Sequence, residues 1–280
     1  MFIAQLKNEL WKLFGKKRTY IGFGAFLLVQ TAMLLMFKYT PWQRQFEHLL
    51  EGNGYLAADY ISALTVARIM LLPQILLLMP LYVALMGGDM VAKEAEDGTL
   101  RMILSRPISR VRLLLVKWAA GTIFSTVLVL ALGAIALGFA RMMFPWRGMF
   151  VFGDASAPTF GLFTAGEGLR LYAFAHLFMV VNAVTMFSVA AMCSCFNMKP
   201  ASATILALSY MLISLVMEHI PFLEAYQNWF ITHHFACWDL MFHTPIPWTQ
   251  IIQSEIVLLA TIATTFIIGA VAFQVRDIKT

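Results

Sequence analysis

The chain has 280 residues, of which 60% are hydrophobic and only 12% are charged, and it carries a formal net charge of +5. A soluble domain averages roughly 25% charged residues, so this composition excludes an ordinary soluble protein. The basic residues lie at the ends of apolar runs, where lipid headgroups account for them, so the charge does not indicate a nucleic-acid partner.

Residues 1–17, MFIAQLKNELWKLFGKK, have the pattern of a basic amphipathic helix. Ile3, Leu6, Leu10 and Leu13 recur at helical spacing, and the lysines fall largely off that stripe. Such a helix is suited to lie in the plane of the membrane interface. We expect an interfacial helix here; the alternative is a charged flank of the first span.

Six long apolar runs follow, and several reach the roughly 20 residues that cross a hydrocarbon core of about 30 Å. They predict an all-α polytopic membrane protein, built as one membrane domain over residues 1–280. In the second run, Pro73 and Pro80 are expected to kink the helix. The expected spans are 20–37, 66–88, 113–140, 171–193, 201–217 and 256–274.

The lysine and arginine residues indicate the orientation of the spans. If the N-terminus is cytoplasmic, 14 of the 20 basic residues lie on the cytoplasmic side and six lie on the other side. This distribution agrees with the excess of positive charge that cytoplasmic loops carry. It predicts a multi-pass protein of the plasma membrane with both termini in the cytoplasm.

A polar segment, residues 89–112, separates the second and third expected spans. Gly87 and Gly88 are expected to end the second span. Lys93 and Asp97 are spaced to pair across one turn of a short helix. The orientation of the spans places this segment in the cytoplasm.

The same segment contains the signals of a folded turn. Gly98 is expected to stop the short helix in a left-handed conformation, and Thr99 to cap a second short helix that Pro107 breaks. Ser109 is expected to cap the third span. Two capped helices exceed what a connecting loop needs, so we expect this segment to dock on a partner protein. The residues expected to anchor the third span at the headgroups are Arg110, Arg112 and Lys117.

Polar side chains inside the expected spans have two interpretations. Buried polar groups in a bilayer usually face the interior of the helix bundle, where they hydrogen-bond between helices. Alternatively, they line the path of a transported substrate. The candidates for such a path are Gln74, Asn182, Thr185, Ser188, Tyr210 and Ser214.

Residues 218–250 lack lysine and arginine and are rich in aromatic residues, so they are too apolar for a solvated loop. We expect short re-entrant helices on the extracytoplasmic side. Imidazole and thiolate groups in this segment could bind a metal, but their spacing matches no standard structural zinc site. Interfacial anchoring is the alternative. These residues are His233, His234, Cys237 and His243.

Motifs for catalysis and nucleotide binding are missing from the sequence. It contains no G-x-x-x-x-G-K-[ST] loop for ATP phosphates, no G-x-S-x-G and no H-E-x-x-H. The chain is therefore expected to bind no cofactor and not to be an enzyme.

The polar segment resembles the cytoplasmic loop of type-2 ABC exporter permeases. The pattern of that family is an acidic residue at the end of the second span, then E-x-E-x-G-T-L, a few apolar residues, P-I-S-R, and a basic residue that opens the third span. The matching residues are Asp89, Glu94, Glu96, Gly98, Thr99, Leu100, Pro107, Ile108, Ser109, Arg110 and Lys117.

The rest of the chain is similar to that family in architecture. The ending FQVRDIKT, with Arg276, Asp277 and Ile278, looks like the family's closing span. Residues 1–17 look like its elbow helix, and residues 218–250 sit where the family places re-entrant helices.

The resemblance implies a permease subunit of an ATP-driven exporter in a bacterial cell or inner membrane. Separate ATP-binding cassette ATPase subunits would bind ATP and Mg, and two permease copies would form a dimer, most simply a homodimer. A coupling helix within residues 89–112 would transmit the ATPase movement. The residues implied at the ATPase interface are Asp89, Glu94, Glu96, Asp97, Gly98, Thr99, Leu100, Arg101, Pro107 and Arg110.

The lipid bilayer is a further expected partner, and an extracytoplasmic accessory protein is another candidate. The sequence does not indicate a substrate. The alternative function is that of a metal- or haem-handling membrane protein or an intramembrane enzyme. That alternative would use His233, His234, Cys237 and His243.

Overall fold

Helices make up most of the protein. The computed structural model describes residues 2–105, 108–151 and 161–276. Six helices in these residues are long and apolar enough to cross a membrane, which agrees with the six spans expected. They are α2 (Lys17–Tyr39), the continuous helix α5–η1–α6 (Ala63–Glu96), α8 (Arg110–Met143), α9 (Ala165–Cys195), α10 (Pro200–Glu218) and α12 (Trp248–Val275).

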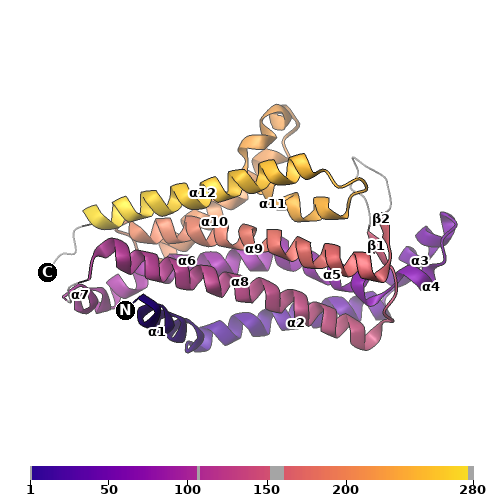
Figure 1. Ribbon diagram of the computed structural model, residues 1–280, viewed down its shortest axis with the longest axis horizontal. Helices are drawn as coiled ribbons and strands as arrows, with labels where there is room; N and C mark the ends of the chain where they lie inside the picture. Colours follow the sequence, from indigo (N-terminus) through magenta and orange to yellow (C-terminus); the bar gives the residue numbers. More distant parts are fainter. Residues whose placement is uncertain (1, 106–107, 152–160, 277–280) are drawn as a thin grey trace.

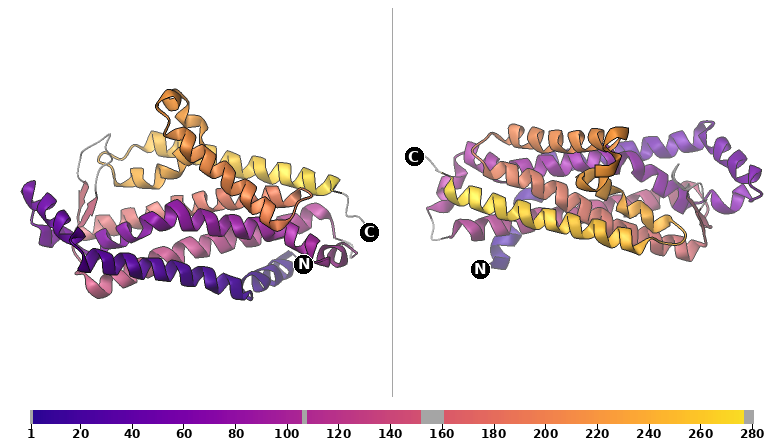
Figure 2. Two further views of the ribbon diagram at one scale, coloured as in Figure 1. Left: turned by 180° about the vertical axis from the view of Figure 1, so that it is seen from behind. Right: turned by 90° about the horizontal axis from the view of Figure 1, so that it is seen from above.

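The long helices run side by side along the longest axis of the molecule (Figure 1). One end carries α1 (Phe2–Phe14), α7 (Thr99–Leu104) and the end of α12. The opposite end carries α3 (Trp42–Gly52) and α4 (Ala57–Tyr60), as the views in Figure 2 also show. The start and the end of the spanning bundle therefore lie at the same end of the molecule.

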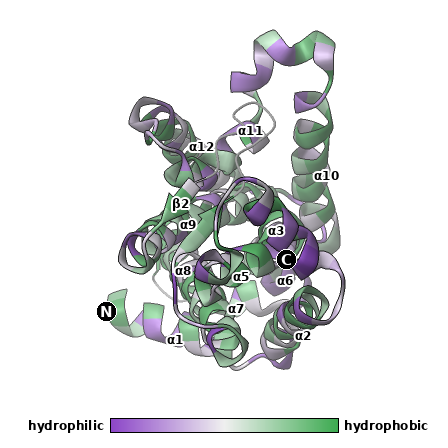
Figure 3. Ribbon diagram, turned by 90° about the vertical axis from the view of Figure 1, so that its right-hand side faces the viewer, coloured by the Kyte–Doolittle hydropathy of each residue, from purple (hydrophilic) through white to green (hydrophobic). Residues whose placement is uncertain are grey.

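The bundle is organised around α9, which is the most buried of the six long helices. It packs against α6, α8, α10 and α12. Seen end-on, α10 stands at the edge of the bundle and shows a largely apolar surface (Figure 3). At 34 residues, α8 is about 51 Å long, so it is longer than a hydrocarbon core of about 30 Å. A helix of this length projects beyond the membrane or tilts within it.

The second long helix changes its winding in the middle. The α-helix α5 (Ala63–Pro73) passes into a π-helical turn η1 (Gln74–Leu78) and then into α6 (Met79–Glu96). Pro73 ends the first part, and Pro80 opens the last part. A proline ring clashes with the carbonyl four residues before it and offers no N–H. The wider π turn accommodates both defects without ending the helix.

The helix does not end at Gly87 and Gly88, where the sequence predicted the end of the second span, because α6 continues to Glu96. The glycines instead allow close packing. A Cβ at Gly87 would lie 2.5 Å from the Phe187 carbonyl oxygen on α9, and one at Gly88 would collide with Thr204 on α10. The two glycines allow helices to pack closely. The sequence alone does not show whether a glycine has this role or ends a helix.

A small sheet interrupts the all-α architecture that was expected. Strand β1 (Met149–Val151) pairs antiparallel with β2 (Gly161–Phe163), with Phe150 opposite Leu162. Strands of three residues are too short to show an alternating pattern, so the sequence did not predict them. The hairpin lies at the same end of the molecule as α3 and α4 (Figure 1).

Residues 218–250 fold as short helices, which are η2 (Pro221–Trp229), α11 (Ile231–Phe235) and η3 (Ala236–Phe242). The first of them projects sideways from the bundle (Figure 1). The last is held to α5, because buried Arg68 forms an ion pair with Asp239 and lies over the Phe242 ring at 5.1 Å. The segment is therefore folded structure and not a solvated loop.

Candidate functional site

The polar segment after the second span forms a helical hairpin at the end of the molecule that carries α1. Here α6 runs to Glu96, Gly98 turns the chain with a φ of +72°, and α7 follows. The left-handed turn predicted at Gly98 is confirmed. The predicted pair is confirmed as well, since Lys93 Nζ lies 3.2 Å from Asp97 Oδ1.

The capping predictions had different outcomes. Thr99 is not the N-cap of α7; Gly98 holds that position, and the Thr99 hydroxyl donates to the Glu94 carbonyl at 3.3 Å. A capping side chain needs an extended backbone, whereas the turn at Gly98 leads Thr99 directly into the helix. Ser109 does cap α8 and accepts from the Arg112 N–H at 3.3 Å. Pro107 lies outside the described residues.

The outer surface of this hairpin, here called the α6–α7 tip, is exposed. Met102 on it is 67% exposed. On the inner side, Leu100 is only 1% exposed and packs with Leu113, Leu114 and Phe273. The hairpin is thus seated on α8 and α12 and presents a mixed charged and apolar surface outward. The residues of the tip are Glu96, Asp97, Gly98, Arg101, Met102 and Ser105.

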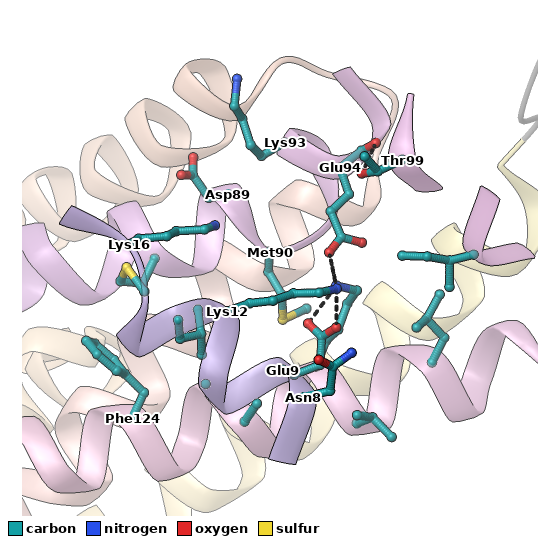
Figure 4. Close-up of a pocket in the computed structure, with 18 of the residues that line it drawn as sticks. Asn8, Glu9, Lys12, Lys16, Asp89, Met90, Lys93, Glu94, Thr99 and Phe124 are labelled. Atoms are coloured by element: carbon teal, nitrogen blue, oxygen red, sulfur yellow. Dashed lines mark hydrogen bonds and ion pairs between the residues drawn. The ribbon is translucent and has the colours of Figure 1, made fainter. Parts of the chain in front are cut away.

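A buried ion-pair cluster supports the hairpin from below. Lys117 on α8 is 3% exposed, and its ammonium lies 2.6 Å from Glu94 on α6 and 2.9 Å from Glu9 on α1. Lys12 on α1 pairs with the same two carboxylates at 3.5 and 2.7 Å. Figure 4 shows Glu9 and Lys12 of α1 and Glu94 of α6 pointing toward one another. We call Lys117, Lys12, Glu9 and Glu94 the Lys117 cluster.

The charges of the cluster affect the protonation of its α1 members. Burial by itself raises the pKa of the Glu9 carboxyl, but the ammonium groups of Lys117 and Lys12 outweigh it and hold the pKa below its ordinary value. Burial lowers the pKa of Lys12, yet Glu9 and Glu94 outweigh it and raise the pKa overall. Both groups are therefore held in their charged forms at neutral pH.

Two further residues of the predicted interface also bind other parts of this chain. Asp89 on α6 forms an ion pair with Arg18 on α2. Arg110 Nη1 donates to the carbonyl oxygens of Phe273, Gln274 and Arg276, at 3.2, 2.9 and 2.8 Å. It thereby satisfies carbonyl groups that the end of α12 leaves without helical partners.

Of the ten residues implied at an ATPase interface, the structure describes all but Pro107, and these nine have different surroundings. Asp89, Glu94, Leu100 and Arg110 face other helices of this chain, and Thr99 is half-buried. The other four, Glu96, Asp97, Gly98 and Arg101, are exposed on the α6–α7 tip.

The six residues predicted to line a substrate path are distributed over α9, α10 and the π turn η1. On α9, Thr185 donates to the Val181 carbonyl of its own helix at 2.8 Å, and Ser188 accepts from the Trp118 indole N–H at 3.0 Å. The Asn182 amide donates to the Phe235 carbonyl on α11 at 2.8 Å. The contacts of Ser188 and Asn182 fit the interpretation of polar groups that join helices, whereas the contact of Thr185 stays within α9.

The other three path candidates are spread over the bundle. Gln74 is buried in the π turn and donates to the Met70 carbonyl at 2.8 Å. Ser214 shares a 3.0 Å hydrogen bond with the Thr232 hydroxyl, and Tyr210 lies on the exposed face of α10. A role of any of the six in a substrate path stays a prediction.

The histidines and the cysteine of residues 218–250 have partners within the chain. The His234 Nε2 lies 3.0 Å from the Asn228 carbonyl, which only accepts, so Nε2 carries the proton and Nδ1 accepts from Ser254 at 3.1 Å. Both ring nitrogens are thus engaged, and burial lowers the pKa of this imidazole, which keeps it neutral. No lone pair of His234 is left for a metal.

His233 and Cys237 also have partners within the chain. His233 contacts Glu218 at 3.3 Å, and the Cys237 thiol donates to Glu255 at 3.2 Å. Burial, together with Glu255, raises the pKa of Cys237, so its thiol stays protonated and is a poor metal ligand. His243 follows η3 at its C-cap. Within residues 2–105, 108–151 and 161–276, no three His, Cys, Asp or Glu residues are grouped to hold a metal ion.

Sequence reasoning missed the Lys117 cluster. It expected Lys117 to anchor α8 at lipid headgroups, but the side chain is buried because α1 folds back across α8. Glu9 was one available signal, since it is the single acidic residue in the basic residues 1–17. Its partners could not be known until the packing of α1 was known.

Comparison with protein families gives a match over nearly the whole chain. A family model described as "ABC-2 family transporter protein" matches residues 6–278 of the chain. The match includes α1 from Leu6 onward, the α6–α7 tip and all six long helices. No curated protein matches the sequence.

Proposed function

The chain belongs to the ABC-2 family of transporter proteins, and from this premise we propose that it is the permease subunit of an ATP-driven exporter whose ATPase is a separate subunit. The family membership and the six apolar helices make it an integral, multi-pass membrane permease. The coupling to ATP, the outward direction and the partners are the proposed parts.

The observation that carries the proposal is the α6–α7 tip. It is an exposed, folded surface that combines charges of both signs with Met102, which is 67% exposed. Leu100 packs against α8, and the Lys117 cluster joins α6 to α8 and α1. A braced, amphipathic surface is suited to receive a force from a docked protein, whereas a slack loop would absorb that force.

The continuity of α6 supports a path by which a displacement of the tip could reach the middle of the helix bundle. The helix that carries Glu96 at the tip runs without a break to the π turn at Gln74–Leu78. ATP binding to the ATPase subunits would displace the tip, and α6 would tilt about that turn. Conformational change of this kind requires that the ATPase bind the two permease states with different affinity.

The lack of an ATP-binding motif in the sequence supports a separate partner that hydrolyses ATP. Transfer of a phosphoryl group needs a preorganised charged site with Mg²⁺, and the sequence of this chain lacks the phosphate-binding loop motif. In the proposal, ATP and Mg therefore bind to the ATPase subunits, and this chain supplies the membrane path.

The geometry and the charge distribution support the proposed placement. The start of α2, the end of α12 and the tip lie at the same end of the molecule (Figure 1). Most of the lysines and arginines are near that end. We place that end in the cytoplasm of a bacterial cell, with α1 as an interfacial elbow helix and η2, α11 and η3 as re-entrant helices. Two copies would form a homodimer, and an extracytoplasmic accessory protein would bind the other end.

Co-purification and ATP hydrolysis with the cognate ATPase test the proposal. A variant with Arg101→Glu and Met102→Asp changes the charge and the apolar contact of the tip but no buried residue. Loss of central contacts in an interface weakens binding on the order of tenfold or more, so we expect the ATPase to co-purify poorly and its stimulation to fall similarly. The matched control is Arg141→Glu, an exposed arginine at the other end of α8.

The proposal is wrong if the tip variant retains full ATPase binding and stimulation, or if the purified chain transports substrate without any ATPase. An equal loss of binding in the Arg141→Glu control would also count against it, because that residue lies far from the tip along α8.

A further inference from the structure

A large cavity lies behind the α6–α7 tip, between α1, α6, α7 and α8. Its volume is about 840 Å³, which is within the range of cavities that hold an organic ligand. Figure 4 shows Lys16 and Asp89 on one side of this space and Phe124 on its floor. Two residues of the tip, Asp97 and Met102, also line this cavity, so the tip forms part of its wall.

The wall of the cavity changes character with depth. Its floor is apolar and includes Phe124 and Phe187, which are 1% and 2% exposed, together with Met86. Its rim carries Lys16 and Lys93. A ligand that fills this space must therefore be charged at one end and apolar at the other, as a phospholipid is.

The charges of the lining leave one cation uncompensated. The lining contains five basic and four acidic side chains. Within the described part of the chain, the acidic ones are engaged by Lys12, Lys117, Arg18 and Lys93. The fifth cation, Lys16, is exposed and has no acidic partner among the described residues. The basic residues are Lys12, Lys16, Arg18, Lys93 and Lys117, and the acidic ones are Glu9, Asp89, Glu94 and Asp97.

The position of Lys16 along the chain also fits a lipid headgroup. It immediately precedes α2, which begins at Lys17, and thus marks the boundary between the polar end of the molecule and its apolar spans. Lysines at this boundary lie at the level of lipid phosphates. Each adds attraction to an anionic membrane surface. The ammonium group of Lys16, which lacks an acidic partner among the described residues, matches a lipid with a net charge of −1 better than a zwitterionic lipid.

We propose that this cavity is a binding site for an anionic phospholipid of the leaflet at the α1 end, with the phosphate beside Lys16 and the first part of an acyl chain against Phe124 and Phe187. The bound lipid fills the space between α1 and the hairpin and so stabilises their arrangement. The site does not depend on ATP coupling, and its test uses the full chain without an ATPase.

The test measures the thermal stability and the retained lipid mass of the delipidated full-length chain in neutral detergent. Three ligands are compared: phosphatidylglycerol, phosphatidylcholine and water-soluble glycerol phosphate. A ligand that binds the folded state raises the melting temperature with its concentration. We expect phosphatidylglycerol to do so, and to remain bound in native mass spectrometry, far more than the other two.

Two variants localise the effect to the cavity. Lys16→Gln removes the uncompensated cation and should weaken phosphatidylglycerol binding about fivefold, as expected for one lysine at an anionic lipid. Lys17→Gln is the matched control, because Lys17 is adjacent and exposed but does not line the cavity. Lys16→Arg should restore binding, which separates loss of charge from loss of structure.

Three results would overturn the proposal. Equal stabilisation by phosphatidylcholine would show that the phosphate charge is not recognised. Equal stabilisation by glycerol phosphate would make the cavity a site for a soluble phosphate. An equal effect of Lys16→Gln and Lys17→Gln would assign the binding to general surface charge.

Discussion

Lys117 illustrates how a buried charge is retained in this protein. Its ammonium is almost completely removed from solvent, and the carboxylates of Glu9 and Glu94 lie within 3 Å of it. A buried ion pair adds little net stability, because desolvation of both charges offsets their attraction. Removing one partner, however, leaves a charge without compensation, and that is costly. The cluster therefore fixes which surfaces of α1, α6 and α8 meet.

Lys117→Met should consequently reduce the free energy of unfolding by about 3–5 kcal/mol, because it leaves Glu9 and Glu94 close together with only Lys12 between them. Denaturant unfolding of the purified chain in detergent measures this. Adding Glu94→Gln should recover part of the loss, since one of the two carboxylates then becomes neutral. The matched control Lys93→Met, at a partly exposed lysine on α6, should leave the free energy of unfolding nearly unchanged, because its ion pairs are open to solvent. Equal effects of both lysine substitutions would contradict this account.

The docking of α1 should depend on pH through Glu9. Its pKa is lowered in the folded protein from an ordinary value of 4.5, so its contribution to stability is present above that value. The contribution is lost as the pH falls through the lowered folded-state pKa. The protection of α1 amides, measured as the hydrogen-exchange rate relative to the intrinsic rate at each pH, should therefore fall below pH 4.5, and Glu9→Gln should remove this pH dependence. A steep change near pH 7 in the unmodified chain would disagree, because neither Glu9 nor Lys12, whose pKa is raised, titrates there.

At the scale of elements, α6 is the part that joins the proposed ATPase contact to the middle of the membrane. Its close contact with α9 depends on Gly87, where a Cβ would lie 2.5 Å from a backbone oxygen of Phe187. A backbone atom in a packed helix cannot move aside as the end of a flexible side chain can. The two helices would have to separate, and the movement of α6 would no longer be transmitted to α9 in the same way.

Gly87→Ala should therefore lower the free energy of unfolding by about 1–3 kcal/mol through overpacking. The matched control is Gly24→Ala on α2, where a Cβ would meet no atom within 4 Å and should leave stability unchanged or slightly raised. Thermal unfolding of both variants in the same detergent gives the comparison. A neutral Gly87→Ala would mean that α6 and α9 are not held together as closely as the structure indicates.

At the scale of the whole molecule, the even number of spans determines which surfaces can meet a partner on each side of the membrane. Ser105 on the α6–α7 tip and Arg141 near the far end of α8 are both exposed, and they lie at opposite ends of the bundle. The native cysteines, Cys193, Cys195 and Cys237, are free and buried. Engineered surface cysteines can thus be distinguished from the native ones.

Labelling with a thiol reagent that does not cross membranes tests the topology. Ser105→Cys should react in inside-out vesicles and Arg141→Cys in right-side-out vesicles, while the chain without either substitution should react in neither. Labelling of both cysteines from the same side would refute the six-span arrangement, and reversed labelling would refute the proposed orientation but not the fold.

The sequence was most informative where a property depends on neighbouring residues only. Runs of apolar residues predicted six spans, because the thickness of a bilayer sets the length of a helix that crosses it. Gly98 was identified as a left-handed turn, and Ser109 as an N-cap, because both depend on the local backbone. The mistaken prediction at Thr99 came from the same local rules, displaced by one residue.

Packing between distant segments decided the rest. Glu94 and Asp89 match a family motif in the sequence, yet their partners Lys117, Glu9 and Arg18 could be recognised only once α1, α2 and α8 were placed beside α6. By itself the sequence determined the spans, their orientation signals and the turn of the hairpin, since these follow from hydropathy and backbone preference along the chain. Only the tertiary structure decided which charges face the tip, which are buried in the Lys117 cluster and which line the cavity, because burial depends on the helices that pack around each side chain.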